Sequence, residues 1–307
     1  MNTTLAEALI RDLPVSKNIS GIEFLDKGYS VDRKYLLYSN GEPCYLLRVS
    51  DISEESARRS DFDLVSQLWT KGIACPQQIA FGVDTEQQAC FIVQSYVSGD
   101  DAEDAITGLT TDQQYALGIQ AGKELRKIHH ALIPSNEVDW FEYRSGKYRR
   151  YQHRAEEMQI SYEGQEEIEQ FIAENLHLLR GRPICFCHGD FHPGNMVVKD
   201  KMLAGIIDFN RCYWGDPYFE FYKLAQFGAP LSTAFARGQI DGYFPERVPS
   251  DFWPLYNVYV AMVLLVDLVW TQHYYPLEIE RSHKLNRIIK DDHDFIHATP
   301  PKWYIPS

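Results

Sequence analysis

The chain has 307 residues, 45% of them hydrophobic and 24% charged, which is typical of a globular protein with one large or two ordinary domains. Its formal net charge of −13 argues against nucleic acid as the main partner, because no basic stripe offsets it. The negative charge is compatible with a cationic small-molecule substrate, and equally with solubility alone.

The cysteines and the apolar segments of the sequence indicate the cellular compartment of the protein. Six cysteines in a chain of this length do not indicate a disulfide scaffold, and Cys185-x-Cys187 lacks the spacing of a zinc site, so we expect free thiols in a reducing compartment. Residues 1–13 lack the apolar segment of a signal peptide. The most apolar run, Val258–Trp270, is short for a bilayer and contains Asp267. The sequence therefore predicts a cytoplasmic protein with no membrane partner.

The first third of the chain has the pattern of an antiparallel sheet with one main helix. Apolar runs separated by turn residues predict five strands, near residues 20–26, 33–38, 44–49, 78–83 and 89–97. Between the third and fourth strands, Phe62, Val65 and Trp69 recur at helical spacing and Gly72 ends the segment. We therefore expect residues 1–97 to form an N-terminal lobe.

After residue 97 the short strands give way to helices, which predicts a second, mainly helical lobe over residues 98–307. Thr111-x-x-Gln114 has the pattern of a capping box that opens a helix. Residues 140–154 form a basic and aromatic stretch that we interpret as irregular. The two lobes together predict an α+β fold.

Three functional side chains lie between apolar runs near residue 190. One apolar run breaks into a polar loop that holds Asp190 and Asn195, and two further runs follow across a turn, the second ending on Asp208. This pattern predicts a strand, a loop and a hairpin that bring the three side chains to one end. One carboxylate can orient a nucleophile, while an amide and a second carboxylate offer the oxygen ligands that Mg²⁺ prefers. The arrangement predicts phosphoryl transfer.

The spacing of these residues is also that of a known family. Residues 188–195, His-Gly-Asp-Phe-His-Pro-Gly-Asn, and Ile207-Asp208 match the motifs His-Gly-Asp-x-His-x-x-Asn and Ile-Asp position by position. The chain thus resembles the aminoglycoside phosphotransferase and choline kinase-like family, which has a two-lobed protein kinase-like fold. Gly215-Asp216-Pro217 resembles the family's next segment, with Glu220 in place of its final aspartate. The resemblance covers most of the chain and implies that ATP and Mg²⁺ are used to phosphorylate a hydroxyl of a small molecule.

The resemblance implies a role for each residue of the central motif. Asp190 would be the catalytic residue, accepting a hydrogen bond from the acceptor hydroxyl and aiming it at the γ-phosphate. Asn195 and Asp208 would hold Mg²⁺ against the ATP phosphates. His188 is expected to support the loop and is given no chemical step.

The resemblance also assigns the nucleotide site. The residues expected to bind ATP are Gly28 and Ser30 in a phosphate-covering loop, Arg48 in the third strand, and Ser95 (carbonyl) and Val97 (amide) at the adenine edge. Kinases normally pair a third-strand lysine with a helix glutamate. Arg48 occupies the lysine position here, and Asp61 fits the glutamate position best, with Asp63 or Glu55 as alternatives.

The phosphate acceptor stays open at this point. An aminoglycoside-like antibiotic, which would imply antibiotic resistance, a choline- or ethanolamine-like amine and a homoserine-type metabolite all remain. Candidate lining segments are residues 140–154, Glu156-Glu157 and the segment carrying Asp267 and Trp270. Acids there suit a cationic acceptor, and aromatic rings could surround it, although ordinary amphipathic packing explains the same residues.

Two other functional classes compete with a small-molecule kinase. Arg48 and Asp61 motivate a catalytically silent kinase-like module that only binds nucleotide. Gly189-Asp190-x-His192 superficially resembles a two-metal phosphohydrolase, for which Asp291-Asp292-His293 would have to supply further ligands. The sequence does not distinguish a monomer from a homodimer.

Overall fold

The computed structural model describes residues 3–26, 32–134 and 138–305, and the chain forms two compact units. The first unit comprises Met1–Asp101 and Asn195–Asn210, and the second comprises Ala102–Gly194 and Arg211–Ser307. The sequence predicts two continuous lobes with a boundary after residue 97, whereas the structure groups a segment from the middle of the chain with the first unit.

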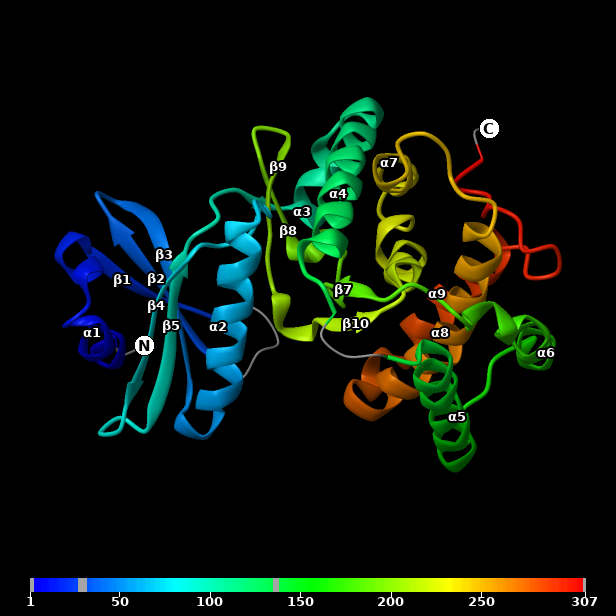
Figure 1. The fold of residues 1–307 in the computed structure, drawn as a ribbon, viewed down its shortest axis with the longest axis horizontal. Helices are drawn as coiled ribbons and strands as arrows, with labels where there is room; N and C mark the ends of the chain where they lie inside the picture. The colour runs from blue at the N-terminus through cyan, green and yellow to red at the C-terminus, as the bar shows by residue number, and fades with distance from the viewer. Residues whose placement is uncertain (1–2, 27–31, 135–137, 306–307) are drawn as a thin grey trace. The chain divides into compact units, whose positions relative to one another are not determined.

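The first unit is built on a five-stranded antiparallel sheet (Figure 1). In spatial order its strands are β1 (Gly21–Leu25), β2 (Arg33–Ser39), β3 (Glu42–Asp51), β5 (Ala89–Ser95) and β4 (Gln78–Asp84). The strands form where the sequence predicts them, because each is an apolar run bounded by turn residues. Asn40-Gly41 joins β2 to β3 with φ of 53° and 85°, the backbone that a two-residue hairpin requires.

Two helices lie on opposite sides of this sheet (Figure 1). Helix α2 (Glu55–Thr70) is the predicted one and contacts β4 and β5. Helix α1 (Thr4–Ile10) was not predicted from the sequence, and its buried apolar residues belong to the same core cluster as Leu47 and Val49 of β3. Because successive strand residues point to opposite faces, Arg48 between them points away from the α1 side.

A small three-stranded sheet completes the first unit. Strands β8 (Met196–Lys199) and β9 (Met202–Ile206) form an antiparallel hairpin, and β6 (Asp100–Asp101) pairs with β8. The turn residues Asp200 and Lys201 both have positive φ, 51° and 67°. This is the hairpin that the sequence predicts between Asn195 and Asp208.

The second unit is mainly helical, as predicted. Its α-helices are α3 (Ala102–Ala105), α4 (Thr111–Ala131), α5 (Trp140–Met158), α6 (Gln165–Asn175), α7 (Thr233–Tyr243), α8 (Phe252–Tyr274) and α9 (Ile279–Asp292). Strands β7 (Cys185–Cys187) and β10 (Tyr213–Gly215) form a two-stranded antiparallel sheet, and Leu224–Gly228 is a π-helix. Short 3-10 helices of the two units lie at Pro14–Asn18, Ile52–Glu54, Ile106–Gly108, Leu176–Leu179, Pro193–Asn195, Phe209–Arg211, Pro217–Phe221 and Pro276–Glu278.

The start of α4 differs by one residue from the prediction. The capping box is formed by Thr110, whose hydroxyl accepts from the Gln113 amide, and by the Gln113 side chain, which accepts from the Thr110 amide. Gln114 instead donates to the carbonyls of Ile106 and Leu109. The sequence contains the Thr-x-x-Gln pattern twice, at Thr110/Gln113 and at Thr111/Gln114, and spacing alone does not show which of the two forms the capping box.

The stretch predicted to be irregular is a regular helix, α5. The Asp139 carboxylate caps it by accepting a hydrogen bond from the Glu142 amide. Trp140, Arg144 and Tyr148 recur every four residues and are all buried. The prediction was wrong because an arginine on the buried face breaks the apolar pattern that identifies an amphipathic helix.

Helix α8 is longer than the apolar run predicted from the sequence. Among the described residues it is the one helix long and apolar enough to cross a membrane by length and composition, with 83% of its apolar window buried inside the protein. Its burial is that of a central core helix, packed against α5, α6 and α9.

Helices α4 and α7 make close backbone contact through glycine. A Cβ atom at Gly122 of α4 would lie 2.1 Å from the Gln239 carbonyl oxygen, and one at Gly238 of α7 would lie 2.2 Å from the Tyr115 carbonyl oxygen. Atoms other than hydrogen do not fit at these positions, so the glycines set the distance between the two helices.

We predict that Gly122→Ala destabilises the protein by about 1–3 kcal/mol, because overpacking exceeds the helix-propensity gain of alanine. Gly108→Ala is the matched control, since its Cβ would meet no atom within 4 Å. The free energy of unfolding from urea titration checks this. Equal stability of the two variants would contradict the proposed close contact.

Candidate active site

Asp190 lies in the second unit, in the loop that follows β7. The loop turns at Gly189, which has φ of 83° and whose Cβ, if present, would lie 2.0 Å from the Arg211 carbonyl oxygen. Only glycine fits there. The Asp190 amide donates to Nδ1 of the fully buried His188 at 3.2 Å, so this histidine supports the loop, as expected.

The loop backbone is held by Glu220, the residue that replaces the family's aspartate. Its two carboxylate oxygens accept from the amides of His188 (2.8 Å) and Gly189 (2.6 Å). Nε2 of His129 lies 3.4 Å from the same carboxylate, and His129 Nδ1 is 2.8 Å from the Tyr243 hydroxyl. Burial raises the pKa of Glu220, but the interactions with His129 and the loop amides outweigh it and lower that pKa. The carboxylate is therefore ionised and structural.

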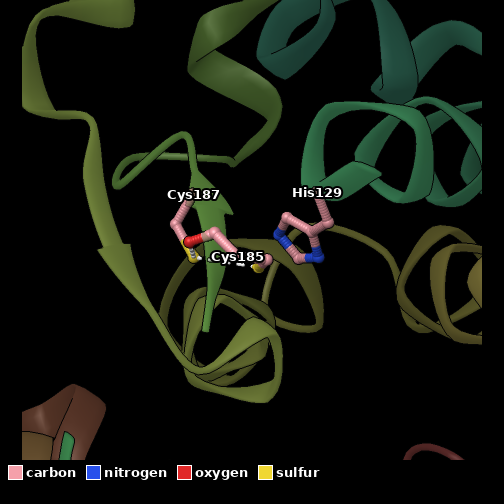
Figure 2. A group of neighbouring side chains, drawn as sticks. All are labelled: His129, Cys185 and Cys187. Atoms are coloured by element: carbon pink, nitrogen blue, oxygen red, sulfur yellow. Dashed lines mark hydrogen bonds between the residues drawn. The ribbon is translucent and has the colours of Figure 1, made fainter. Parts of the chain in front are cut away.

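His129 also lies beside Cys185 and Cys187, whose ligand atoms are all within 4.8 Å of one another (Figure 2). Both ring nitrogens of His129 already have partners, as the preceding contacts show. Burial raises the pKa of the Cys187 thiol well above its usual range, which disfavours the thiolate that a metal would need. We therefore interpret the group as part of the core that supports β7.

Three basic side chains surround the Asp190 carboxylate. Lys223 Nζ lies 2.6 Å from Oδ1, Arg211 Nη1 lies 3.6 Å from Oδ2, and His192 Nε2 lies 3.7 Å from Oδ1. The Gly194 amide donates to His192 Nδ1, which places the proton of the neutral ring on Nε2, facing the carboxylate. Lys223 is buried, and its ammonium lies 4.9 Å from the centre of the Phe227 ring.

This environment fixes the charge of Asp190. Burial alone raises the pKa of Asp190, but His192 and Lys223 more than offset it and hold that pKa far below its usual range. Burial lowers the pKa of Lys223, while Tyr222 and Asp190 raise it above its ordinary value. Both partners are therefore ionised at neutral pH. A carboxylate of this kind is a weak base, suited to orient a hydroxyl.

The two predicted magnesium ligands lie in the first unit. The Ile207 amide donates to the Asn195 carbonyl oxygen at 2.9 Å, next to the Met196–Ile206 pair of the hairpin, so Asn195 and Asp208 lie at the same end of β8 and β9. Asp208 has φ of 67°, uncommon for a residue other than glycine. A carboxamide and an exposed carboxylate form a donor set that suits Mg²⁺. Their position relative to Asp190, in the other unit, stays a prediction.

The predicted pairing of Arg48 with Asp61 is wrong for this structure. Arg48 forms an ion pair with Asp32 at 2.7 Å, whereas Asp61 pairs with Arg58 of its own helix at 2.6 Å. Aspartate is one methylene shorter than glutamate, and Arg58 lies only one turn away. The contact leaves open whether Arg48 binds phosphate.

Other predicted nucleotide residues are placed as follows. Gly28 and Ser30 lie outside the described residues. Ser95 ends β5, where its amide donates to the Gln77 carbonyl and its hydroxyl accepts from the Gln77 amide. Val97 follows and lies close to Gly205 of β9. The proposed adenine contacts of Ser95 and Val97 stay predictions.

Sequence reasoning missed two sets of basic residues. The first set is Lys223 and Arg211, which flank Asp190. The second is Lys34 of β2, which lies opposite Arg48 in the strand register and interacts electrostatically with Asp208. A signal existed for Lys223, which is a single cation at the end of the aromatic run 217–222. Arg211 and Lys34 resemble ordinary surface charges in the sequence.

Known proteins share this fold. Similar solved structures include aminoglycoside phosphotransferase APH(2'')-Ib with ADP (17% identity, 94% of this chain and 98% of that chain covered, TM-score 0.63). A streptomycin–ATP complex of APH(2'')-IIa matches at 18% identity, 99% coverage of both chains and TM-score 0.63. A choline/ethanolamine kinase family protein from Mesorhizobium loti matches at 15% identity, 97% and 98% coverage and TM-score 0.67. These matches confirm the kinase-like α+β fold.

The sequence comparisons address the family. No curated protein sequence matches the chain significantly. The model of a family described as the phosphotransferase enzyme family matches residues 21–253, which is most of the chain. The protein therefore belongs to the phosphotransferase enzyme family.

Proposed function

We propose that this protein transfers the γ-phosphate of ATP to a hydroxyl group of a small molecule, with Mg²⁺, in the cytoplasm. The observation that carries the proposal is the Asp190 loop, in which Glu220 holds the backbone and Lys223 keeps the carboxylate ionised. Two of the similar solved structures are complexes with ADP and with ATP, which supports the choice of nucleotide.

Asp190 performs the orienting step. Its carboxylate accepts a hydrogen bond from the acceptor hydroxyl, whose oxygen forms the new bond to the γ-phosphorus as the bond to the β,γ-bridging oxygen breaks. The proton leaves late, because the carboxylate is weakly basic. No covalent enzyme intermediate is needed.

The other proposed site residues neutralise the negative charge of the ATP phosphates or bind the nucleotide. Asn195 and Asp208 hold Mg²⁺, which neutralises phosphate charge when bound. Lys34 of β2 and Arg48 of β3 lie opposite each other and supply positive charge on the same face of the sheet. Ser95, Val97, Gly28 and Ser30 complete the proposed nucleotide site.

The two competing classes predict different behaviour. A silent module would bind magnesium-ATP without consuming it on any acceptor. For a two-metal phosphohydrolase, His293 is a poor ligand, since Nδ1 faces the Ile289 carbonyl and Nε2 the Tyr256 hydroxyl. An acceptor screen by ATP consumption tests the proposal; it covers aminoglycosides, choline-like amines, hydroxy-amino acids and hydroxyl compounds that carry a carboxylate or a phosphate. Absence of acceptor-dependent ATP consumption throughout would refute it.

Asp190→Asn is expected to lower kcat by about 10²- to 10⁴-fold, because an amide cannot accept the hydroxyl proton. Nucleotide affinity should stay unchanged. Asp200→Asn in the hairpin turn is the matched control and should behave as wild type. Turnover by Asp190→Asn near that of the control would rule out this mechanism.

Asp208→Asn is expected to raise the Mg²⁺ concentration needed for nucleotide binding at least about tenfold, because a charged ligand is lost. Asparagine tolerates the positive φ of Asp208, so the fold should persist. Fluorescent ADP titrated with Mg²⁺ measures the effect. An unchanged magnesium requirement would remove Asp208 from the metal site.

Lys223→Met is expected to move the acid limb of the pH–activity profile upward. Burial raises the folded pKa of Asp190, while His192 and Lys223 together depress it, so removing the ammonium raises that pKa and activity is lost at a higher pH as the pH falls. The limb should move upward, toward the usual carboxyl pKa of about 4. Lys223→Arg should keep the limb low. Identical profiles for wild type and Lys223→Met would contradict the role of this ion pair.

A further inference from the structure

Helix α5 carries a buried cation, Arg144, for which the described part of the chain provides no ion pair. Arg144 is 3% exposed, and neither Nε nor Nη2 has a hydrogen-bond partner among the described residues. Its guanidinium carbon lies 3.9 Å from the centre of the Phe219 ring. Burial lowers the pKa of Arg144, and the strongest electrostatic interactions that oppose this come from tyrosine hydroxyls. An ionised guanidinium in this position remains under-satisfied.

Arg144 is linked to Asp190 through adjacent side chains. The Phe219 ring lies 4.7 Å from the Tyr222 ring, and the Tyr222 ring centre lies 5.2 Å from Lys223 Nζ. Lys223 in turn pairs with Asp190. Tyr222 is partly exposed and interacts electrostatically with both cations. Arg144 and the catalytic carboxylate thus belong to one contiguous region of the second unit.

The charges around this region favour an anion. Lys147 follows Arg144 by one turn, and its pKa is lowered by burial and by the charges of Arg144 and Arg150, so positive charge accumulates along α5. The acid on α8 is Asp267, whose carboxylate accepts from Gln226 and interacts electrostatically with Lys223; burial raises its pKa, which favours the neutral form. Asp267 does not compensate Arg144. An incoming anion would supply the missing partner, and a buried charge gains most from one.

We propose that the phosphate acceptor carries an anionic group, a carboxylate or a phosphate, and that Arg144 binds this group while the acceptor hydroxyl lies at Asp190. The inference rests on the proposed function and narrows its substrate class. It departs from the cationic acceptor that the sequence left among the alternatives, because Lys223, Arg211 and Arg144 repel a molecule that carries only positive charge. A carboxylate and a phosphate monoester offer the same paired oxygens to a guanidinium fork.

A matched series of acceptors tests the class. Glycerol, 3-amino-1,2-propanediol, D-glycerate and glycerol 3-phosphate share hydroxyl groups and differ in one substituent, which is neutral, cationic, a carboxylate or a phosphate. We expect kcat/KM for an anionic member to exceed that for the neutral one by about 10- to 100-fold. Preference for the neutral or cationic member would overturn the inference and leave the proposed function intact.

Variants locate the anion site. Arg144→Met should raise KM for the anionic acceptor by about 10- to 100-fold with little change in KM for ATP, because one charged hydrogen-bond donor is lost. Arg149→Met is the control, since Arg149 is an exposed arginine on the same helix. Arg144→Met should melt at or above the temperature of wild type, because methionine removes an uncompensated buried charge. A lower melting temperature with unchanged KM would show a structural role and overturn the inference.

A binding measurement works without turnover. D-glycerate, glycerol 3-phosphate and inorganic phosphate are titrated against wild type and both variants in chloride-free buffer, with thermal unfolding as the readout. The inference expects at least one anion to raise the melting temperature of wild type and of Arg149→Met, and not of Arg144→Met. The inference would be overturned if an anion raised the melting temperature of Arg144→Met as it does that of wild type, or if no anion raised the melting temperature of wild type. Stabilisation through Arg144 without transfer to any acceptor would instead count against the proposed function.

Discussion

One buried carboxylate determines the geometry of the loop that carries Asp190. Glu220 accepts the amide hydrogens of His188 and Gly189, so the backbone that leads into Asp190 has a fixed direction before any substrate arrives. Burying a carboxylate is costly unless hydrogen bonds compensate it, and two amides together with His129 do so here. The extra methylene of glutamate relative to aspartate lets the carboxylate reach both amides from the 3-10 helix Pro217–Phe221.

The electrostatics of the second unit follow from that fixed loop. Because the position of Asp190 is set by its backbone, Lys223 and Arg211 can be placed against the two carboxylate oxygens separately. Preorganised charges of this kind need no rearrangement during the reaction. The same cations make the surroundings of Asp190 locally positive, although the net charge of the whole chain is −13. Local charge outweighs net charge at short range.

The sequence predicted most of the architecture and the identity of the family, because both depend on local signals. The strands of the first sheet are apolar runs between turns, and the motif around Asp190 has fixed spacing. Contacts between distant residues were not predictable in this way. The Arg48–Asp32 pair depends on the register of β2 and β3, and Lys223 reaches Asp190 across 33 positions of sequence, about the length of a supersecondary unit. Helix α5 was missed because Arg144 occupies a core position.

The glycine contact between α4 and α7 has a consequence for the loop that carries Asp190. Tyr243, the last residue of α7, bonds to His129 near the end of α4, and His129 in turn faces Glu220. The distance between the two helix backbones therefore sets the length of a chain of hydrogen bonds that ends at the catalytic loop. Widening the helix pair at a glycine, far from any substrate, would shift the loop amides and with them the aim of Asp190.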